Sequence, residues 1–188
     1  MTFKENPVPI ESKIPDGDIA LNPSNIYLFK EKKANIAYRE FKRLLDKGYV
    51  GLCITRSHPN IIRERYGLKN CTIIWMTSNN LQDYETLAPN EISRLVSLLT
   101  KFISPNGNRS EGNNKDTASL KRVIILDNIE YLIVQNNFQT ILRILHIVRD
   151  KIMLCQAINL IPIDPLSIDI KELRLLEHEC EVIDVKDY

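Results

Sequence analysis

The chain has 188 residues, of which 44% are hydrophobic and 26% charged, a composition typical of a globular domain with a buried core. Lys and Arg number 25 against 24 Asp and Glu, so the formal net charge is +1. Nucleic-acid binders usually carry a basic excess, so we expect no nucleic-acid partner. No apolar run approaches the ~20 residues of a membrane span, and the N-terminus lacks a signal pattern, so we expect no membrane partner.

The cysteines indicate the compartment. Cys53, Cys71, Cys155 and Cys180 are scattered along the chain without a C-x-x-C pair. Three of them lie in apolar segments, which is typical of free thiols that pack as small hydrophobic groups. The pattern predicts a reducing, cytoplasmic setting.

Apolar spacing predicts strands and helices that alternate along a single α/β domain over residues 25–188. The first 24 residues are rich in proline, which favours an extended tail or linker. Residues 104–119 contain almost nothing to bury and are expected to form a flexible insertion. The predicted strands cover residues 26–29, 49–55, 71–77, 123–126, 157–163 and 181–185, the last at an edge. The predicted helices cover residues 34–47, 59–67, 89–103, 137–151 and 169–179.

The strand at residues 123–126 is the predicted centre of the fold. Its sequence, V-I-I-L, has three β-branched members and no polar position, as expected of a strand buried on both faces. Strand–helix alternation predicts right-handed crossovers, and therefore a three-layer sandwich with a mainly parallel sheet. Asp127 follows this strand directly. Ligands of open α/β sheets bind outside the carboxyl ends of the strands, so Asp127 stands where a site is expected.

The turn after the first strand lacks the phosphate loop of nucleotide hydrolases. That loop reads G-x-x-x-x-G-K-[ST], and its backbone amides cradle phosphates. The chain has six glycines, none followed by Lys-Ser or Lys-Thr, and the turn reads K-E-K-K. We therefore expect no hydrolysis, no catalytic residue, no enzyme activity and no cofactor.

Lysines in this turn form a first candidate site. Lys30, Lys32 and Lys33 precede a predicted helix, whose free amides and dipole favour an anion. They are candidate anion-binding residues. The alternative is a solvated loop.

Polar residues at predicted strand ends form a second candidate site, for a ligand or for structure. If the strands are neighbours, these residues converge on one rim of the sheet. Asp127 looks like an acid that holds magnesium in phosphate-binding proteins. The alternative, which we favour, is an Arg–carboxylate pair that locks the exit loops. The three histidines have no metal-ligand spacing, so we expect no metal site. The rim residues are Thr55, Arg56, Asp127, Glu130 and Asp164.

Several motifs resemble an archaeal family of uncharacterised domains. They are G-L-C-I-T-R-S-H-P at residues 51–59, I-I-W-M-T at 73–77, L-D-N-I-E-Y-L-I at 126–133 and I-P-I-D-P at 161–165. Members of that family are often attached C-terminal to PAS and histidine-kinase sensory modules. The order of elements is also distantly similar to the RecA and KaiC ATPase core, without its Walker A loop. In that comparison Asp127 corresponds to the Walker B acid. Asn128 departs from the glycine expected beside it.

The resemblance and the residues together lead to two functional hypotheses. The first is a non-catalytic protein-interaction or signalling module with a degenerate RecA/KaiC-like fold. Its partner would be another protein, such as a sensory or regulatory protein, or a second copy in a homodimer. The second is a regulatory domain that binds a nucleotide or another anion without hydrolysis.

Overall fold

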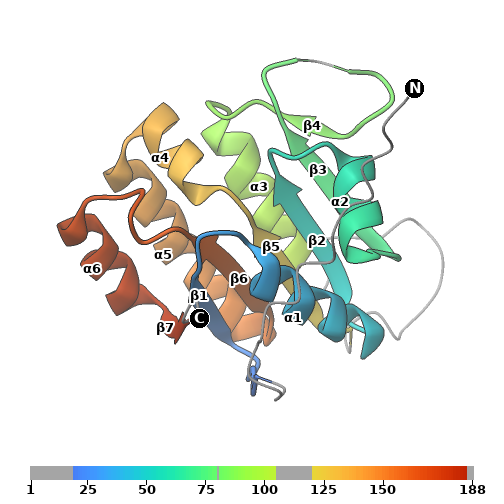
Figure 1. Ribbon diagram of the computed structural model, residues 1–188, viewed down its shortest axis with the longest axis horizontal. Coiled ribbons are helices and arrows are strands. Elements are labelled where there is room, and N and C mark those ends of the chain that lie inside the picture. The colour runs from blue at the N-terminus through green and yellow to red at the C-terminus, as the bar shows by residue number, and fades with distance from the viewer. Residues whose placement is uncertain (1–18, 80, 105–119, 186–188) are drawn as a thin grey trace, which may run out of the picture.

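The computed structural model describes residues 19–79, 81–104 and 120–185. In this part of the chain one seven-stranded sheet has the order β4-β3-β2-β5-β6-β1-β7, and all its pairs are parallel (Figure 1). The predicted α/β class with a mainly parallel sheet is confirmed. The strands are β1 (Asn25–Lys30), β2 (Val50–Thr55), β3 (Cys71–Met76), β4 (Thr86–Leu87), β5 (Arg122–Leu126), β6 (Ile158–Ile163) and β7 (Glu181–Asp184).

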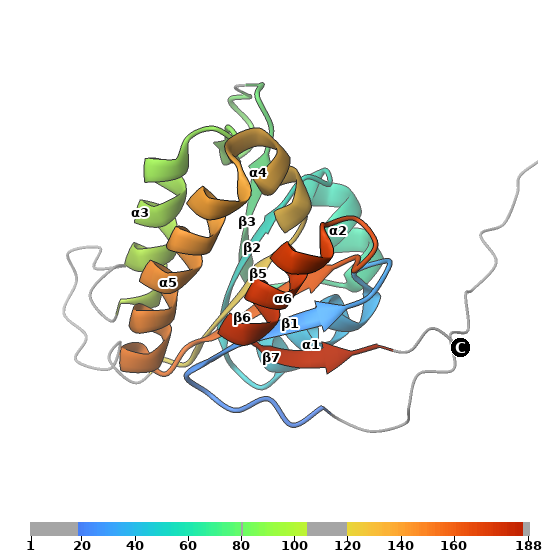
Figure 2. The same ribbon diagram turned by 90° about the vertical axis from the view of Figure 1, so that its left-hand side faces the viewer.

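Helices cover both faces of the sheet, which confirms the three-layer sandwich (Figures 1 and 2). One face packs against α3, α4, α5 and α6, and the other against α1 and α2. The helices are α1 (Asn35–Asp46), α2 (Pro59–Tyr66), α3 (Ile92–Ile103), α4 (Ile129–Asn136), α5 (Phe138–Cys155) and α6 (Ile170–Glu179).

The strand predicted to be central, β5, lies between β2 and β6 and is buried along its whole length. Its side chains alternate between the two apolar cores. Ile124 and Leu126 join the core on the α5 side, while Val123 and Ile125 join the core on the α1 side. An unbroken apolar sequence is therefore required here, because neither face of β5 meets water.

Two glycines fix where α1 ends and how closely it packs. Gly48, just after α1, has a φ of +86°, a left-handed conformation that favours glycine. At Gly51 a Cβ would lie 2.4 Å from Leu45 Cδ2 and 2.9 Å from Phe41 Cζ. Both contacts come from α1, so the helix packs closely on β2 because Gly51 has no side chain.

The boundaries differ from prediction where the sequence pattern is weak. The short β4 lies at the end of a segment expected to be a polar loop, since two residues are too few to show a period. Helix α4 was not predicted, because its apolar run follows the strand after only Asp127 and Asn128. Helix α3 begins at Ile92 and not at Pro89. Of the predicted tail, residues 1–18 lie outside the described residues, as do residues 105–119 of the predicted insertion.

Among the described residues, none of the helices combines the length and apolar character that crossing a membrane would require.

One polar side chain in the core has no partner. Asn159 of β6 is 0% exposed, and neither its Oδ1 nor its Nδ2 has a hydrogen-bond partner in the described structure. It pairs in register with Ile26 of β1 and Ile124 of β5, and both of these side chains belong to the core on the α5 side. A buried amide without partners destabilises the folded state.

Replacing this amide by an apolar group should therefore stabilise the protein. We expect Asn159→Leu to raise the free energy of unfolding by about 1–2 kcal/mol in urea denaturation. Asn159→Asp, which has nearly the same shape, should lower it, because a charge would be buried without a counter-ion. A loss of stability in Asn159→Leu would show that the amide is satisfied.

Candidate functional site

The carboxylate of Asp127 lies at the carboxyl end of β5 and is held by two hydroxyl groups. Thr55, at the end of the neighbouring β2, donates a hydrogen bond of 2.8 Å to Asp127 Oδ2. Tyr38 of α1 donates one of 2.9 Å to the same oxygen. All three residues are buried, with exposed fractions of 7% for Asp127, 0% for Thr55 and 1% for Tyr38. The sequence predicted Thr55 and Asp127 at one rim of the sheet, and it gave no signal that Tyr38 would join them.

Burial raises the pKa of Asp127 above its ordinary value, although the hydrogen bonds from Thr55, Tyr38 and the Asn128 backbone act in the opposite direction. Hydroxyl groups stabilise the charged form less than a cation would. The proton affinity of this acid is therefore governed by its exclusion from water.

A chain of polar contacts continues from Asp127 below α1. Tyr38 Oη lies 3.6 Å from Cys53 Sγ. The phenol has one proton and gives it to Asp127, so the thiol is the donor to Tyr38. Burial raises the pKa of both the Cys53 thiol and the Tyr38 phenol. Both groups therefore stay protonated at neutral pH, as this arrangement requires.

The ring of Tyr66 covers Tyr38. The two rings are stacked at 4.2 Å with an interplanar angle of 4°. Tyr66 Oη donates to Asn35 Oδ1 at 3.2 Å, which ties the end of α2 to the start of α1. The stack shields the Asp127–Tyr38 contact on the side of α2.

Glu31 satisfies the amino end of α1. Its Oε2 accepts a hydrogen bond from the Ile36 amide at 2.8 Å, and its Oε1 accepts one from the Ala37 amide at 2.9 Å. The helix has no side-chain cap at Ala34 and no acid in its first turn. Glu31 comes from the loop after β1 and supplies the missing negative charge. Sequence reasoning missed this role, because Glu31 stands among lysines and precedes the helix by four residues.

The Glu31 carboxyl is 4% exposed, and burial raises its pKa to about 7. The amides of Ala37, Ile36 and Asn35 lower this pKa, and the charge of Asp127 raises it. Glu31 and Asp127 are therefore two electrostatically coupled acids near the carboxyl ends of β1 and β5.

The lysines predicted to bind an anion have different surroundings. Lys30 Nζ lies 3.2 Å from Glu177 Oε1 and 3.2 Å from Asp184 Oδ2, so it joins α6 and β7 to the end of β1. Lys32 and Lys33 are exposed. The amides of Ile36 and Ala37, which an anion would use at this helix end, already bind Glu31.

Within the described residues, Arg56 is not found in the Arg–carboxylate pair that we favoured as the structural role of the rim residues. Its guanidinium lies over the ring of Tyr131, 3.7 Å from the centroid. Its backbone amide donates to Asn128 Oδ1 at 3.3 Å, and its carbonyl accepts a bond of 2.9 Å from Trp75 Nε1. Asp127 is held by the hydroxyls of Thr55 and Tyr38.

Asn128 has a φ of 64°, a left-handed conformation. Asparagine tolerates this conformation better than most residues, so it can replace the glycine expected beside Asp127. Its side chain is then available to receive the Arg56 amide.

The remaining rim residues form a separate group. Glu130 Oε1 accepts hydrogen bonds from the Asp164 amide at 2.9 Å and from Ser167 Oγ at 3.3 Å. Burial raises the pKa of Glu130, and these bonds lower it. Glu130 thus fastens the loop after β6 to the start of α4. The predicted rim is divided into two clusters, one centred on Asp127 and one on Glu130.

Metal binding has no support from this geometry. Within residues 19–79, 81–104 and 120–185, no three His, Cys, Asp or Glu side chains are grouped so that they could hold a metal ion. The acids at the strand ends are bonded to hydroxyls and amides of the protein itself.

Fold and site together define a parallel α/β sandwich domain with buried acids at the carboxyl ends of its strands. The chain belongs to the family described as "Protein of unknown function (DUF835)", whose model matches residues 30–180.

A solved structure from Pyrococcus horikoshii OT3, described as a structural study of Project ID PH0250, is similar to this chain with a TM-score of 0.54. The similarity covers 89% of this chain and 84% of that one, at 11% sequence identity. At this identity the likeness concerns the fold alone. None of the curated proteins matches the chain at a significant level.

The raised pKa of Glu31 predicts a pH dependence of stability. The folded-state pKa of about 7 lies above the ordinary value of 4.5, so the folded state binds the proton more tightly. The free energy of unfolding should therefore fall as the pH rises from 5 to 8, by at most about 3 kcal/mol from this group. Urea denaturation at four pH values measures the slope. Glu31→Gln should flatten it.

Glu91→Gln is the matched control for this experiment. Glu91 also lies at the start of a helix, but it is exposed, and a hydrogen bond from the Ala88 amide lowers its pKa. The slope between pH 5 and 8 should stay unchanged in this variant. An unchanged slope in Glu31→Gln would contradict the role of Glu31.

The two hydroxyls on Asp127 predict an energetic coupling. Tyr38→Phe and Thr55→Val should each destabilise the protein by about 1–3 kcal/mol, because each leaves a buried carboxylate with one donor fewer. Since both donors serve one oxygen, the double variant should deviate from additivity by at least about 0.5 kcal/mol. Tyr66→Phe, which lacks a bond to Asp127, is the control. Strict additivity would mean that the hydroxyls act independently.

Proposed function

We propose that this protein is a non-catalytic protein-interaction or signalling module with a degenerate RecA/KaiC-like fold. Its partner is another protein, such as a sensory or regulatory protein, or a second copy of the chain. The free cysteines fit a reducing, cytoplasmic setting for this role.

The observation that carries the proposal is the position of the Glu31 carboxylate. In a phosphate-binding α/β domain, the amides at the start of the first helix bind the phosphates of a nucleotide. Here the amides of Ile36 and Ala37 bind Glu31. A phosphate would have to displace this carboxylate or approach a like charge. This supports a domain that keeps its architecture without gripping a triphosphate.

One exposed cation and four half-buried aromatic side chains at the same edge of the sheet support a role in protein binding. Arg56 is exposed over Tyr131, and His58, Trp75 and Tyr84 form an edge-to-face aromatic group beside it. Arginine, tryptophan and tyrosine are enriched among the residues that dominate protein–protein binding energy. We call this group of five residues the aromatic rim and propose it as the contact surface.

The second candidate is an anion- or nucleotide-binding regulatory domain without hydrolysis. Asp127 at the end of β5 and the exposed Lys32 and Lys33 favour it. The two candidates differ in their response to nucleotides.

Thermal shift with ATP, ADP, GTP and cyclic nucleotides, each with magnesium, distinguishes them. A ligand at 100 times its dissociation constant stabilises by about 2.7 kcal/mol, which is readily seen as a rise in Tm. We expect no shift with the wild type. A rise with any of these nucleotides would favour the regulatory ligand-binding domain.

Affinity capture from native lysate tests the interaction. Arg56→Ala with Tyr84→Ala should weaken recovery of the specific partner by at least about tenfold, as expected for a loss of two central contacts. Arg174→Ala on α6, exposed and away from the aromatic rim, is the control. Light scattering over a concentration series tests whether the partner is a second copy. Unchanged recovery and unchanged self-association in the double variant would contradict the proposed surface.

A further inference from the structure

An extended segment takes the place of a helix on one face of the sheet. On the α1 side, α1 packs on β2, β5 and β6, and α2 packs on β3. Tyr27 and Phe29 of β1 are nevertheless 5% and 0% exposed. Ile19 and Leu21 pack against this core. We call residues 19–22 the strap.

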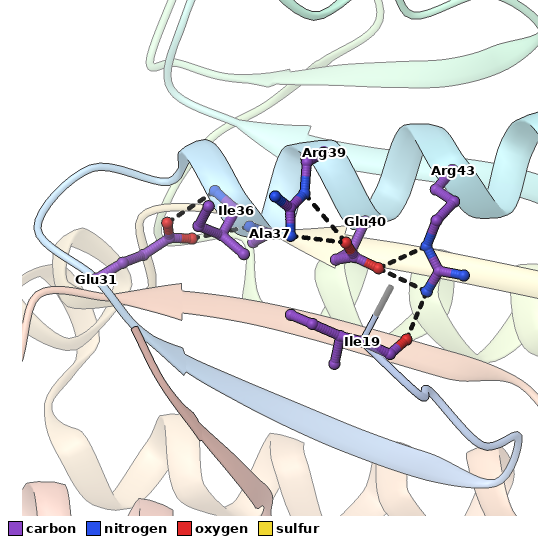
Figure 3. A network of polar contacts seen from close by, with 7 residues as sticks. All are labelled: Ile19, Glu31, Ile36, Ala37, Arg39, Glu40 and Arg43. Atoms are coloured by element: carbon purple, nitrogen blue, oxygen red, sulfur yellow. Dashed lines mark hydrogen bonds and ion pairs between the residues drawn. The ribbon is translucent and has the colours of Figure 1, made fainter. Parts of the chain in front are cut away.

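The two ends of the strap are attached differently. At the end next to β1, the Asn22 amide donates to Tyr27 Oη at 2.7 Å, and the following Ser24 amide donates to the Ala157 carbonyl at 2.8 Å. At the other end, Arg43 Nη2 of α1 donates to the Ile19 carbonyl at 2.7 Å (Figure 3). One end is thus bonded beside the sheet, and the other is held by a side chain.

A buried acid orients Arg43. Glu40 is 1% exposed, and its Oε2 accepts a bond of 2.6 Å from Arg43 Nε. Arg43 Nη2 lies 2.5 Å from the same oxygen, and this nitrogen also reaches Ile19 (Figure 3). A buried carboxylate is strongly unfavourable without its partner, so Glu40 fixes the guanidinium in place. Arg39 pairs with the opposite oxygen, Oε1, at 3.2 Å.

We propose that the strap is a releasable latch, closed by Arg43 and positioned by Glu40. Its release uncovers apolar side chains of the core on the α1 side, such as Tyr27 of β1, whose hydroxyl the Asn22 amide contacts. In the closed state, the strap itself covers this part of the core on the α1 side. This device is independent of the aromatic rim, which lies at the carboxyl ends of β2 and β3.

Hydrogen exchange on the whole protein, followed by mass spectrometry or NMR, tests the latch. Arg43→Gln should speed exchange of the Asn22 amide by about tenfold or more, because local opening becomes more frequent. Arg39→Gln is the matched control: it removes the same charge from the same acid, and no bond from Arg39 to residues 19–22 is found in the described structure. In Arg39→Gln, the Asn22 amide should exchange at the wild-type rate.

A second readout separates opening of the strap from general loosening. The buried amides of β5 should keep wild-type protection in Arg43→Gln while the strap loses it. Equal strap exchange in Arg43→Gln and the wild type would overturn the proposal, as would equal acceleration in Arg39→Gln. If Arg43→Gln does not fold, Arg43→Lys replaces it, since lysine keeps the charge but cannot contact Glu40 and Ile19 with the same fork. Wild-type strap protection in Arg43→Lys would then overturn the proposal.

Discussion

Buried acids near the strand ends must be satisfied by hydrogen-bond donors of the protein itself, and this constraint shapes the candidate site. Asp127 receives hydroxyls from β2 and α1, and Glu31 receives two amides from the start of α1. Without these donors, the desolvation of each carboxylate would destabilise the folded state with no hydrogen bond to offset it. The position of α1 over the sheet is therefore tied to both acids at once.

Helix α1 connects the separate features of the molecule. Glu31 caps its amino end, Tyr38 reaches toward the sheet to Asp127, and the buried Glu40 orients Arg43 toward the strap. The close packing at Gly51 leaves the helix little room to move over β2. A change at the strap or at Glu31 would thus act on the same rigid element.

The amino end of α1 serves a structural purpose in this domain. Glu31 places a negative charge at this helix end, where free amides and the helix dipole favour one. Burial raises the pKa of Glu31 although the amides of Ala37, Ile36 and Asn35 lower it, so the loss of water outweighs these hydrogen bonds.

The sequence by itself determined the layered parallel sheet, the buried central strand and the position of Asp127 and Thr55 at strand ends. These features follow from local signals, namely the spacing of apolar residues and the alternation of strands and helices along the chain. The sequence did not determine α4, whose apolar residues continue the pattern of the strand before it. Only the tertiary structure decided which donors meet which acids. Tyr38 and Asp127 form a hydrogen bond although they are 89 residues apart in the sequence. The guanidinium of Arg56 packs on the ring of Tyr131 and, in the described part of the chain, does not pair with a carboxylate. Such pairings depend on how the helices pack on the sheet, and the spacing of residues along the chain does not predict that packing.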